Sequence, residues 1–213
     1  MKDIFPVRKE YKKGSLSEND LPEDPLDLFF LWFSEAIDLQ LPEVNAAALA
    51  TANKDGCPSL RTVLIKEIDS RGFVFYTNYQ SRKGRDLEEN PRASLMIYRS
   101  ETERQITVEG RVEKISEKES EKYFAGRPRE SRLAAICSPQ GQEIPSGEFL
   151  RQRYLDAEEE FHGKDIPKPS FWGGFRLIPE RYTFWQGREY RLHDRFLYRK
   201  IAGNEWKISR LAP

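Results

Sequence analysis

The part of this sequence richest in groups that could bind an anion is residues 61–83, which read RTVLIKEIDSRGFVFYTNYQSRK. Its basic side chains include Arg61 and Lys66, at the edges of the first apolar run, and Arg82 and Lys83, which come after the second. The last two follow Ser81, where a helix is expected to begin, and the free N–H groups of a helix start favour an anion. The combination suits a phosphate dianion. It also suits a surface hairpin with a solvated basic helix start, and the stretch alone leaves both interpretations open.

A second polar group lies around a predicted break between two helices. Ser116 and Glu119 form a capping-box pattern, so a helix is predicted from there to about Phe124. After the break, Ser131 is expected to cap the next short helix. Tyr123, Arg127 and Ser131 would then offer a phenol, a guanidinium and a hydroxyl, a set that suits a phosphate. A plain helix–helix corner with a capping serine is the alternative.

A third group lies near the C-terminus, where Arg191, His193 and Arg195 alternate along the chain. On an extended segment these side chains point to one face, where three basic groups repel unless an anion or acid meets them. An edge strand with solvated charges is the alternative. The other histidine is His162, expected to be exposed; the two histidines have no metal-ligand spacing, so we expect no metal site.

Strands are expected to position these groups. Runs at Arg61–Ile68 and Phe73–Thr77 flank a turn at residues 69–72 and predict a hairpin. With Ala46–Ala52 they form a meander, and Arg92–Tyr98 and Gln105–Ile115 add two strands. Five strands with short links predict a closed or nearly closed barrel. Further strands are predicted at residues 171–178, 181–186, 196–201 and 206–211.

Helices flank these strands. Asp24 and Pro25 predict a helix start, with Pro42 after its end. Its core-facing stripe is predicted to be Leu28, Phe29, Trp32, Phe33, Ala36 and Ile37. A second amphipathic helix is predicted over Glu148–Phe161, with its buried side chains at Phe149, Tyr154 and Phe161. We expect residues 1–23 to form an N-terminal arm and residues 24–213 a single, mainly β domain.

Composition limits the possible partners. The 213 residues carry 35 basic and 35 acidic side chains, so net charge attracts neither nucleic acid nor an anionic membrane. The longest apolar run, Leu28–Phe33, is far too short to span a bilayer, and no apolar signal core begins the chain. Two cysteines without a CxxC favour a reducing cytoplasm over a disulfide framework. No Walker A or GxGxxG pattern is present.

Taken together, several separated strings resemble the pyridoxamine 5′-phosphate oxidase family. They are RTVLIK, FYTN, SRK, PSFWGGFRL, FWQG, RLHDRF and the terminal RLAP. The resemblance implies an FMN-binding split β-barrel that forms a homodimer, with FMN at the subunit interface. The implied reaction oxidises pyridoxamine 5′-phosphate or pyridoxine 5′-phosphate to pyridoxal 5′-phosphate, while O2 reoxidises the flavin and gives H2O2.

The resemblance also implies roles for individual residues. The implied cofactor-binding residues are Arg61, Thr62, Val63, Leu64, Ile65, Lys66, Tyr76, Thr77, Arg82, Lys83, Gln105, Gln140, Gly141, Trp185 and Arg195. The implied substrate-binding residues are Arg8, Tyr11, Lys66, Tyr123, Arg127, Ser131, Arg191 and His193. Arg191 and His193 would act over the pyridine ring and are the catalytic candidates.

Two positions depart from the family pattern. Gly141 stands where related sequences can carry serine, and Lys9 replaces one of a pair of arginines. A non-catalytic split-barrel protein that carries or senses flavin or pyridoxal phosphate is the alternative function. The presence of both a flavin-phosphate set and a substrate-phosphate set favours the oxidase.

Overall fold

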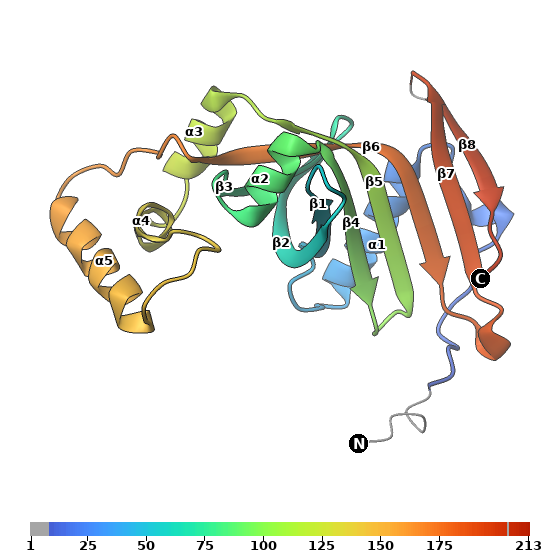
Figure 1. Ribbon diagram of the computed structural model, residues 1–213. Coiled ribbons are helices and arrows are strands. Elements are labelled where there is room, and N and C mark those ends of the chain that lie inside the picture. Colours follow the sequence, from blue (N-terminus) through green and yellow to red (C-terminus); the bar gives the residue numbers. More distant parts are fainter. Residues whose placement is uncertain (1–8, 204) are drawn as a thin grey trace. The chain divides into compact units, whose positions relative to one another are not determined.

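The computed structural model describes residues 9–203 and 205–213 (Figure 1). Its helices are α1 (Pro25–Asp38), α2 (Arg82–Glu89), α3 (Glu117–Ala125), α4 (Arg129–Cys137) and α5 (Gly147–Glu160), with short 3-10 turns η1 (Glu18–Asp20) and η2 (Glu189–Arg191). Its strands are β1 (Ala46–Ala52), β2 (Pro58–Asp69), β3 (Gly72–Asn78), β4 (Arg92–Arg99), β5 (Arg104–Lys114), β6 (Trp172–Gln186), β7 (Asp194–Ala202) and β8 (Glu205–Arg210).

The strands form one sheet that closes on itself. Their order is β3-β2-β1-β4-β5-β6-β7-β8, and β3 pairs with β6 as well as with β2. The first six strands in this order therefore make a closed barrel, and β7 and β8 extend the sheet beyond β6. The predicted meander and closed barrel are confirmed, but the barrel has six strands and not the five predicted, because β6 closes it against β3.

The chain divides into two compact units, which are described separately. One contains the described residues up to Leu49 together with Ser94–Gly110 and Pro179–Pro213. The other contains Ala50–Ala93 and Arg111–Ile178. We call them unit 1 and unit 2.

Unit 2 carries the predicted hairpin. Phe73, Val74 and Phe75 of β3 are fully buried, and Phe75 pairs with Phe175 of β6. The register between β2 and β3 shifts at Lys66, the extra residue of a β-bulge. Bulges re-aim side chains and are common next to functional sites.

Local signals set the helices of unit 2. Ser81 caps α2, and the Ser116 capping box starts α3, both as predicted. The prediction that Ser131 caps the next helix is wrong. Helix α4 begins at Arg129, directly after Pro128, because the fixed φ of proline suits the start of a helix. The buried residues of the helical cluster are Phe124, Leu133, Cys137, Ala157, Ile166 and Trp172. Phe149, predicted to be buried, is 38% exposed.

In unit 1, α1 starts at Pro25 with Asp24 as its cap, as predicted. Most of its apolar stripe is buried, and Trp32 meets the ring of Phe184 edge-on at 5.4 Å. Ile37 is 50% exposed, so the stripe is narrower than predicted. No helix in the described part of the chain is long and apolar enough to cross a membrane.

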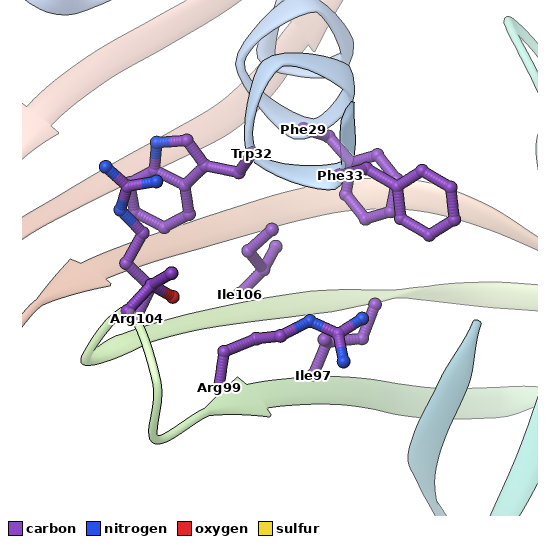
Figure 2. Close-up of a pocket in the computed structure, with 8 residues that line it drawn as sticks. Phe29, Trp32, Phe33, Ile97, Arg99, Arg104 and Ile106 are labelled. Atoms are coloured by element: carbon purple, nitrogen blue, oxygen red, sulfur yellow. The ribbon is translucent and has the colours of Figure 1, made fainter. Parts of the chain in front are cut away.

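A small pocket of unit 1 lies beneath α1, as Figure 2 shows. Its volume is about 20 Å³, room for little more than one water. Arg104 stacks over Trp32 at 4.6 Å and donates to Gln186 at 2.7 Å, while Arg99 donates to the carbonyl of Val44. Because these cations already have partners, the pocket is a feature of core packing.

The C-terminal strands differ from expectation in one respect. The two strands predicted on either side of Pro179 are one strand, β6. Its register with β3 ends at Leu177, and its register with β7 begins at Arg181. Pro179 lies between the two registers, a place where a missing N–H is tolerated.

Candidate functional site

A cleft of about 290 Å³ opens in unit 2. Its lining residues come from β2, β3, α2, the α3–α4 break, the loop before α5 and β6. They are Thr62, Val63, Leu64, Lys66, Tyr76, Thr77, Lys83, Tyr123, Arg127, Gln140 and Trp172. The structure therefore brings residues from both predicted phosphate-binding groups into one cleft.

One wall of the cleft is a stack of parallel rings. Tyr76 and Tyr123 stack with centroids 3.7 Å apart and planes 8° apart, and Trp172 continues the stack 5.5 Å from Tyr76. The Tyr76 hydroxyl donates to Glu67 at 2.9 Å. Burial, and then this contact with Glu67, raises the pKa of the Tyr76 phenol. The wall is thus a flat, neutral surface suited to a planar ring.

Lys83 lies in the first turn of α2 and is only 9% exposed. Its ammonium donates to Thr77 Oγ1 at 3.1 Å, Ser81 Oγ at 3.2 Å and Gln140 Oε1 at 3.2 Å. None of these acceptors carries a charge. Burial, together with repulsion from Arg61, lowers the pKa of Lys83 to about 8. A buried ammonium among neutral acceptors favours an added anion.

Arg61 differs from Lys83 because an acid partly balances its charge. It donates to Thr51 Oγ1 at 2.8 Å and to Ser59 Oγ, and Asp86 lies 3.8 Å away. Asp86 also accepts from Thr51 and Ser59, which ties β1, β2 and α2 together. Arg61 is therefore oriented by a network inside unit 2 and does not line the cleft itself.

Arg127 is the second cation of the cleft with a special environment. Its guanidinium lies over the Trp172 ring at 4.7 Å, and its Nη1 is buried without a hydrogen-bond partner. A buried donor left without an acceptor costs about 1–3 kcal/mol. Lys66, exposed on β2, lines the same cleft. The cleft thus contains three cations, Lys66, Lys83 and Arg127, and the buried Nη1 of Arg127 has a hydrogen to donate.

The remaining predicted residues of unit 2 are not among those that line the cleft. Ser131 is half-buried inside α4, Arg82 is exposed and donates to the Pro58 carbonyl at 3.3 Å, and Ile65 is buried in β2. Gly141 follows Gln140 with φ of 79°. Glycine suits this left-handed position, which gives a backbone reason for its presence here.

Unit 1 holds a separate cluster of predicted residues. Tyr11 meets Trp185 edge-on at 5.5 Å and His193 at 5.5 Å, while Trp185 and His193 lie 4.8 Å apart. Arg195 sits opposite Trp185 in the β6–β7 register. Gln105, on β5, donates to Thr107 at 3.3 Å. Arg8 lies outside the described residues.

We predicted that Arg191, His193 and Arg195 share one face of an extended segment. This prediction is wrong, because the segment is not extended at Arg191. Arg191 lies in η2 with φ of 62°, and the strand begins only at Asp194. The turn arises because two successive residues, Tyr190 and Arg191, take left-handed conformations, which breaks the alternation. Arg191 is exposed there.

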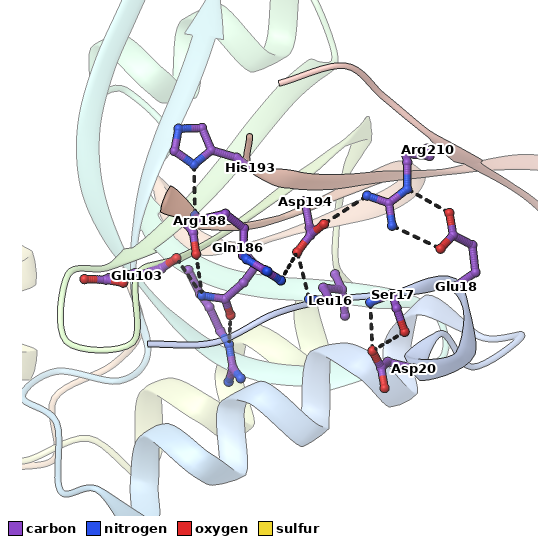
Figure 3. Close-up of polar contacts among 12 residues, drawn as sticks. Leu16, Ser17, Glu18, Asp20, Glu103, Gln186, Arg188, His193, Asp194 and Arg210 are labelled. Carbon is purple, nitrogen blue, oxygen red and sulfur yellow. Dashed lines mark hydrogen bonds and ion pairs between the residues drawn. The ribbon is translucent and has the colours of Figure 1, made fainter. Parts of the chain in front are cut away.

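His193 has a defined hydrogen-bonding state. Its Nδ1 accepts the N–H of Arg188 at 3.0 Å (Figure 3). Burial, and then the charge of Arg191, lowers the pKa of His193. The neutral ring therefore carries its proton on Nε2, which is left as a donor.

Sequence reasoning gave no role to three neighbours of these residues: Trp172, Glu67 and Asp86. Trp172 stands within the quoted string PSFWGGFRL, where an aromatic beside two glycines was the available signal. Asp86 bonds with Thr51 and Ser59, which lie 35 and 27 residues away, and Glu67 bonds with Tyr76 across the hairpin, so no contiguous motif marks either residue. In the described residues no cluster of His, Cys, Asp and Glu could hold a metal ion.

Comparisons with known proteins show which family this chain is similar to. A family model described as "Pyridoxamine 5'-phosphate oxidase" matches residues 33–159, and one described as "Pyridoxine 5'-phosphate oxidase C-terminal dimerisation region" matches residues 172–213. The pyridoxine/pyridoxamine 5′-phosphate oxidase of Cupriavidus taiwanensis is 50% identical over the full length of both chains. That of Trichormus variabilis is 49% identical, covering 99% of this chain and 98% of its own.

Solved structures are similar as well. PhzG from Burkholderia lata 383, in complex with tetrahydrophenazine-1-carboxylic acid, has a TM-score of 0.85 and 35% identity, covering 92% of this chain and 95% of its own. A pyridoxamine 5′-phosphate oxidase-related, FMN-binding protein from Nostoc punctiforme has a TM-score of 0.71 over 91% of this chain and 100% of its own; at 18% identity it supports the split-barrel fold alone. The chain therefore belongs to the pyridoxine/pyridoxamine 5′-phosphate oxidase family, as the sequence strings predicted.

Proposed function

We propose that this protein is an FMN-dependent oxidase that converts pyridoxamine 5′-phosphate and pyridoxine 5′-phosphate to pyridoxal 5′-phosphate. The observation that carries the proposal is the unit 2 cleft, where Lys66, Lys83 and Arg127 converge beside a flat aromatic wall. Two phosphates, one on the cofactor and one on the substrate, account for this number of cations better than one phosphate does.

The substrate phosphate is assigned to Lys66, Tyr123, Arg127 and Ser131. Arg127 is the centre of this set, because its buried Nη1 has a hydrogen to donate and no acceptor. A phosphate oxygen would satisfy it with a charge-assisted bond. Trp172 fixes the guanidinium from one side, so the acceptor must approach from the cleft.

The FMN phosphate is assigned to Arg61, Arg82 and Lys83. Lys83 supports the assignment, since three neutral acceptors surround it at a helix start and an anion would compensate its buried charge. Thr62, Val63, Leu64, Ile65, Lys66, Tyr76 and Thr77 would run along the flavin, with Gln140 and Gly141 at its edge. Gln105, Trp185 and Arg195 of unit 1 complete the proposed set.

When bound, FMN would supply the redox chemistry, the transfer of two electrons from the substrate to O2. The alcohol and O2 give pyridoxal 5′-phosphate and H2O2; the amine also consumes water and releases ammonia. The residues of this chain hold the phosphates and orient the substrate carbon toward the flavin. Tyr11, Arg191 and His193 are assigned to the substrate, with Arg8 as a further candidate.

The test is the absorption spectrum of the purified protein under anaerobic conditions. We expect a yellow protein that bleaches with pyridoxamine 5′-phosphate and with pyridoxine 5′-phosphate, and that consumes O2 and forms H2O2 once air is admitted. Bound flavin that neither substrate reduces would instead favour a carrier or sensor.

We further propose that the active protein is a homodimer with flavin shared between chains, and that residues 24–213 act as one domain behind an arm of residues 1–23. The match to a dimerisation region over residues 172–213 supports the dimer. Sedimentation of dilute flavin-loaded protein should give twice the 25.0 kDa chain mass. A flavin-loaded monomer would overturn it.

A further inference from the structure

One buried carboxylate, that of Glu103, contacts the N-terminal arm of unit 1 at three residues, in addition to the bonds from Lys13 Nζ to the Glu101 carbonyl and from Lys9 Nζ to the Ser100 carbonyl. Glu103 Oε2 accepts the backbone N–H of Lys12 at 2.8 Å and of Lys13 at 3.0 Å, and Oε1 pairs with the Lys9 ammonium at 3.1 Å. The Glu103 side chain is 1% exposed. Burial acts to raise the pKa of Glu103, but these contacts outweigh it and lower the pKa below its ordinary value.

The turn that carries Glu103 is itself fixed. Glu103 has φ of 56°, and its carbonyl accepts the N–H of Gly187 at 2.8 Å and Nε2 of Gln186 at 3.3 Å. Gln186 is fully buried and accepts from Arg104 (Figure 3). The carboxylate therefore projects from a rigid support and not from a mobile loop.

Tyr11 precedes the two residues that Glu103 binds. Its ring packs edge-on against Trp185 and His193. Gly187 makes room for it: a Cβ there would lie 2.8–2.9 Å from Tyr11 Cγ, Cβ and Cδ1. The position of the Tyr11 ring against Gly187 thus depends on where the backbone of the arm is held.

We propose that Glu103 is a positioning residue, which fixes Tyr11 against Trp185 and His193 through the backbone of Lys12 and Lys13 before substrate binds. The inference rests on the proposed function in one respect, the assignment of Tyr11 to the substrate. An arm ordered in advance spares the substrate the entropy of ordering it, which strengthens binding.

A second set of contacts fixes the later part of the arm. Loss of the Glu103 contacts should therefore affect only the earlier part. The Leu16 N–H donates to Asp194 at 3.1 Å, and Glu18 pairs with Arg210 at 2.7 Å (Figure 3). Residues 9–15 should then become free while η1 stays in place.

The direct test is tryptic cleavage after Lys12 and Lys13 in the flavin-loaded protein. Glu103→Asn removes the charge and shortens the side chain, while asparagine tolerates the left-handed backbone of this position. We expect cleavage to be about ten-fold faster than in wild type, because charge-assisted bonds are lost. Glu101→Asn is the matched control on the same turn and should cleave at the wild-type rate.

The kinetic test asks whether Glu103 acts through Tyr11. Glu103→Asn should raise the KM for pyridoxamine 5′-phosphate about ten-fold, with a smaller effect on kcat. In a Tyr11→Ala background the same change should have no further effect on KM. Full additivity of the two changes would overturn the proposal, as would wild-type cleavage of the arm in Glu103→Asn.

A second variant tests the position of Tyr11 independently, in case Glu103→Asn does not fold. Gly187→Ala leaves the carboxylate intact but places a methyl group against Tyr11. We expect the same rise in KM, abolished in the Tyr11→Ala background; a persistent rise there would count against the proposal. If wild type does not oxidise the phosphorylated substrates, the proposed function fails, and the cleavage rates alone decide on the role of Glu103.

Discussion

The Lys83 ammonium donates to the side-chain oxygen of Gln140 at 3.2 Å, although 57 residues separate the two in sequence. The same oxygen accepts from Thr77 Oγ1 at 2.9 Å and from the Asn78 N–H at 3.3 Å. Three donors thus converge on one neutral acceptor in the cleft. An anionic oxygen would interact more strongly with the same donors, which supports the proposed phosphate site.

The first prediction concerns pH and flavin affinity. The pKa of Lys83 is about 8 in the protein without ligand, and a bound phosphate should raise it, so binding takes up a proton above that pH. The affinity of the apoprotein for FMN should therefore stay constant from about pH 7 to about pH 8. Above about pH 8 the affinity should fall by up to about ten-fold per pH unit. Fluorescence titration measures this profile.

Lys83→Arg is the control for this profile, since arginine stays charged throughout the range. Its FMN affinity should be nearly independent of pH up to about pH 9.5. A wild-type profile that the variant reproduces would show that another group titrates.

The second prediction is that Lys83 lowers the stability of the folded apoprotein, although it contributes to FMN binding. Its folded pKa lies below its unfolded value of 10.5, so between about pH 8 and about pH 10.5 the unfolded chain binds more protons and this group's contribution to stability rises with pH. Near neutral pH, Lys83→Met should therefore stabilise the apoprotein, by on the order of 1–3 kcal/mol. Thermal unfolding measures the gain, and the variant should no longer retain FMN. A lower Tm for the variant apoprotein would contradict the prediction.

Local sequence signals gave the elements that frame the cleft. The turn at residues 69–72, the Ser81 cap and the Ser116 capping box each involve neighbours in sequence, and each is present as predicted. Their energetics are complete within a few residues, which is why a pattern can reveal them.

Tertiary contacts account for what the patterns did not reveal. The alternation of Arg191, His193 and Arg195 indicated a strand, but left-handed backbone at Arg191 ends it. Lys66 owes its place to a bulge in the register with β3, and Arg127 owes its orientation to Trp172. Such placements depend on partners tens of residues away, so the list of candidate residues could be drawn up from resemblance but their geometry could not.

The third prediction separates the two phosphate sites. Arg127→Met should raise the KM for pyridoxamine 5′-phosphate by about ten- to a hundred-fold, because a charge-assisted bond of roughly 1.5–3 kcal/mol is lost. Flavin content should stay unchanged. Trp172→Leu should show a weaker form of the same effect, since the guanidinium loses the ring that orients it, and Trp172→Phe should recover part of it. Loss of flavin in Arg127→Met would place this arginine at the cofactor instead.

The last prediction assigns the two nitrogens of His193 to different tasks. Nδ1 accepts the Arg188 N–H at 3.0 Å and holds the η2 turn, which leaves the Nε2 proton for the substrate. Asparagine can replace the first nitrogen and glutamine the second. We therefore expect His193→Asn to keep wild-type stability and flavin content while anaerobic flavin reduction by pyridoxamine 5′-phosphate slows about ten-fold, or about 1.4 kcal/mol on the barrier. His193→Gln should lose stability of the turn and keep more of the rate.

The pH dependence of His193 gives the same assignment a second check. Because its pKa lies below the ordinary 6.5, the ring is neutral in the folded protein at neutral pH, while the unfolded chain binds more protons around pH 6.5. This group's contribution to stability should rise with pH through that window and be lost on acidification, when a protonated Nδ1 no longer accepts the Arg188 N–H. The reduction rate should fall with it in wild type, and His193→Asn, which cannot titrate, should lack that acid limb. An acid limb that persists unchanged in His193→Asn, or a wild-type reduction rate in that variant, would show that His193 only braces the turn.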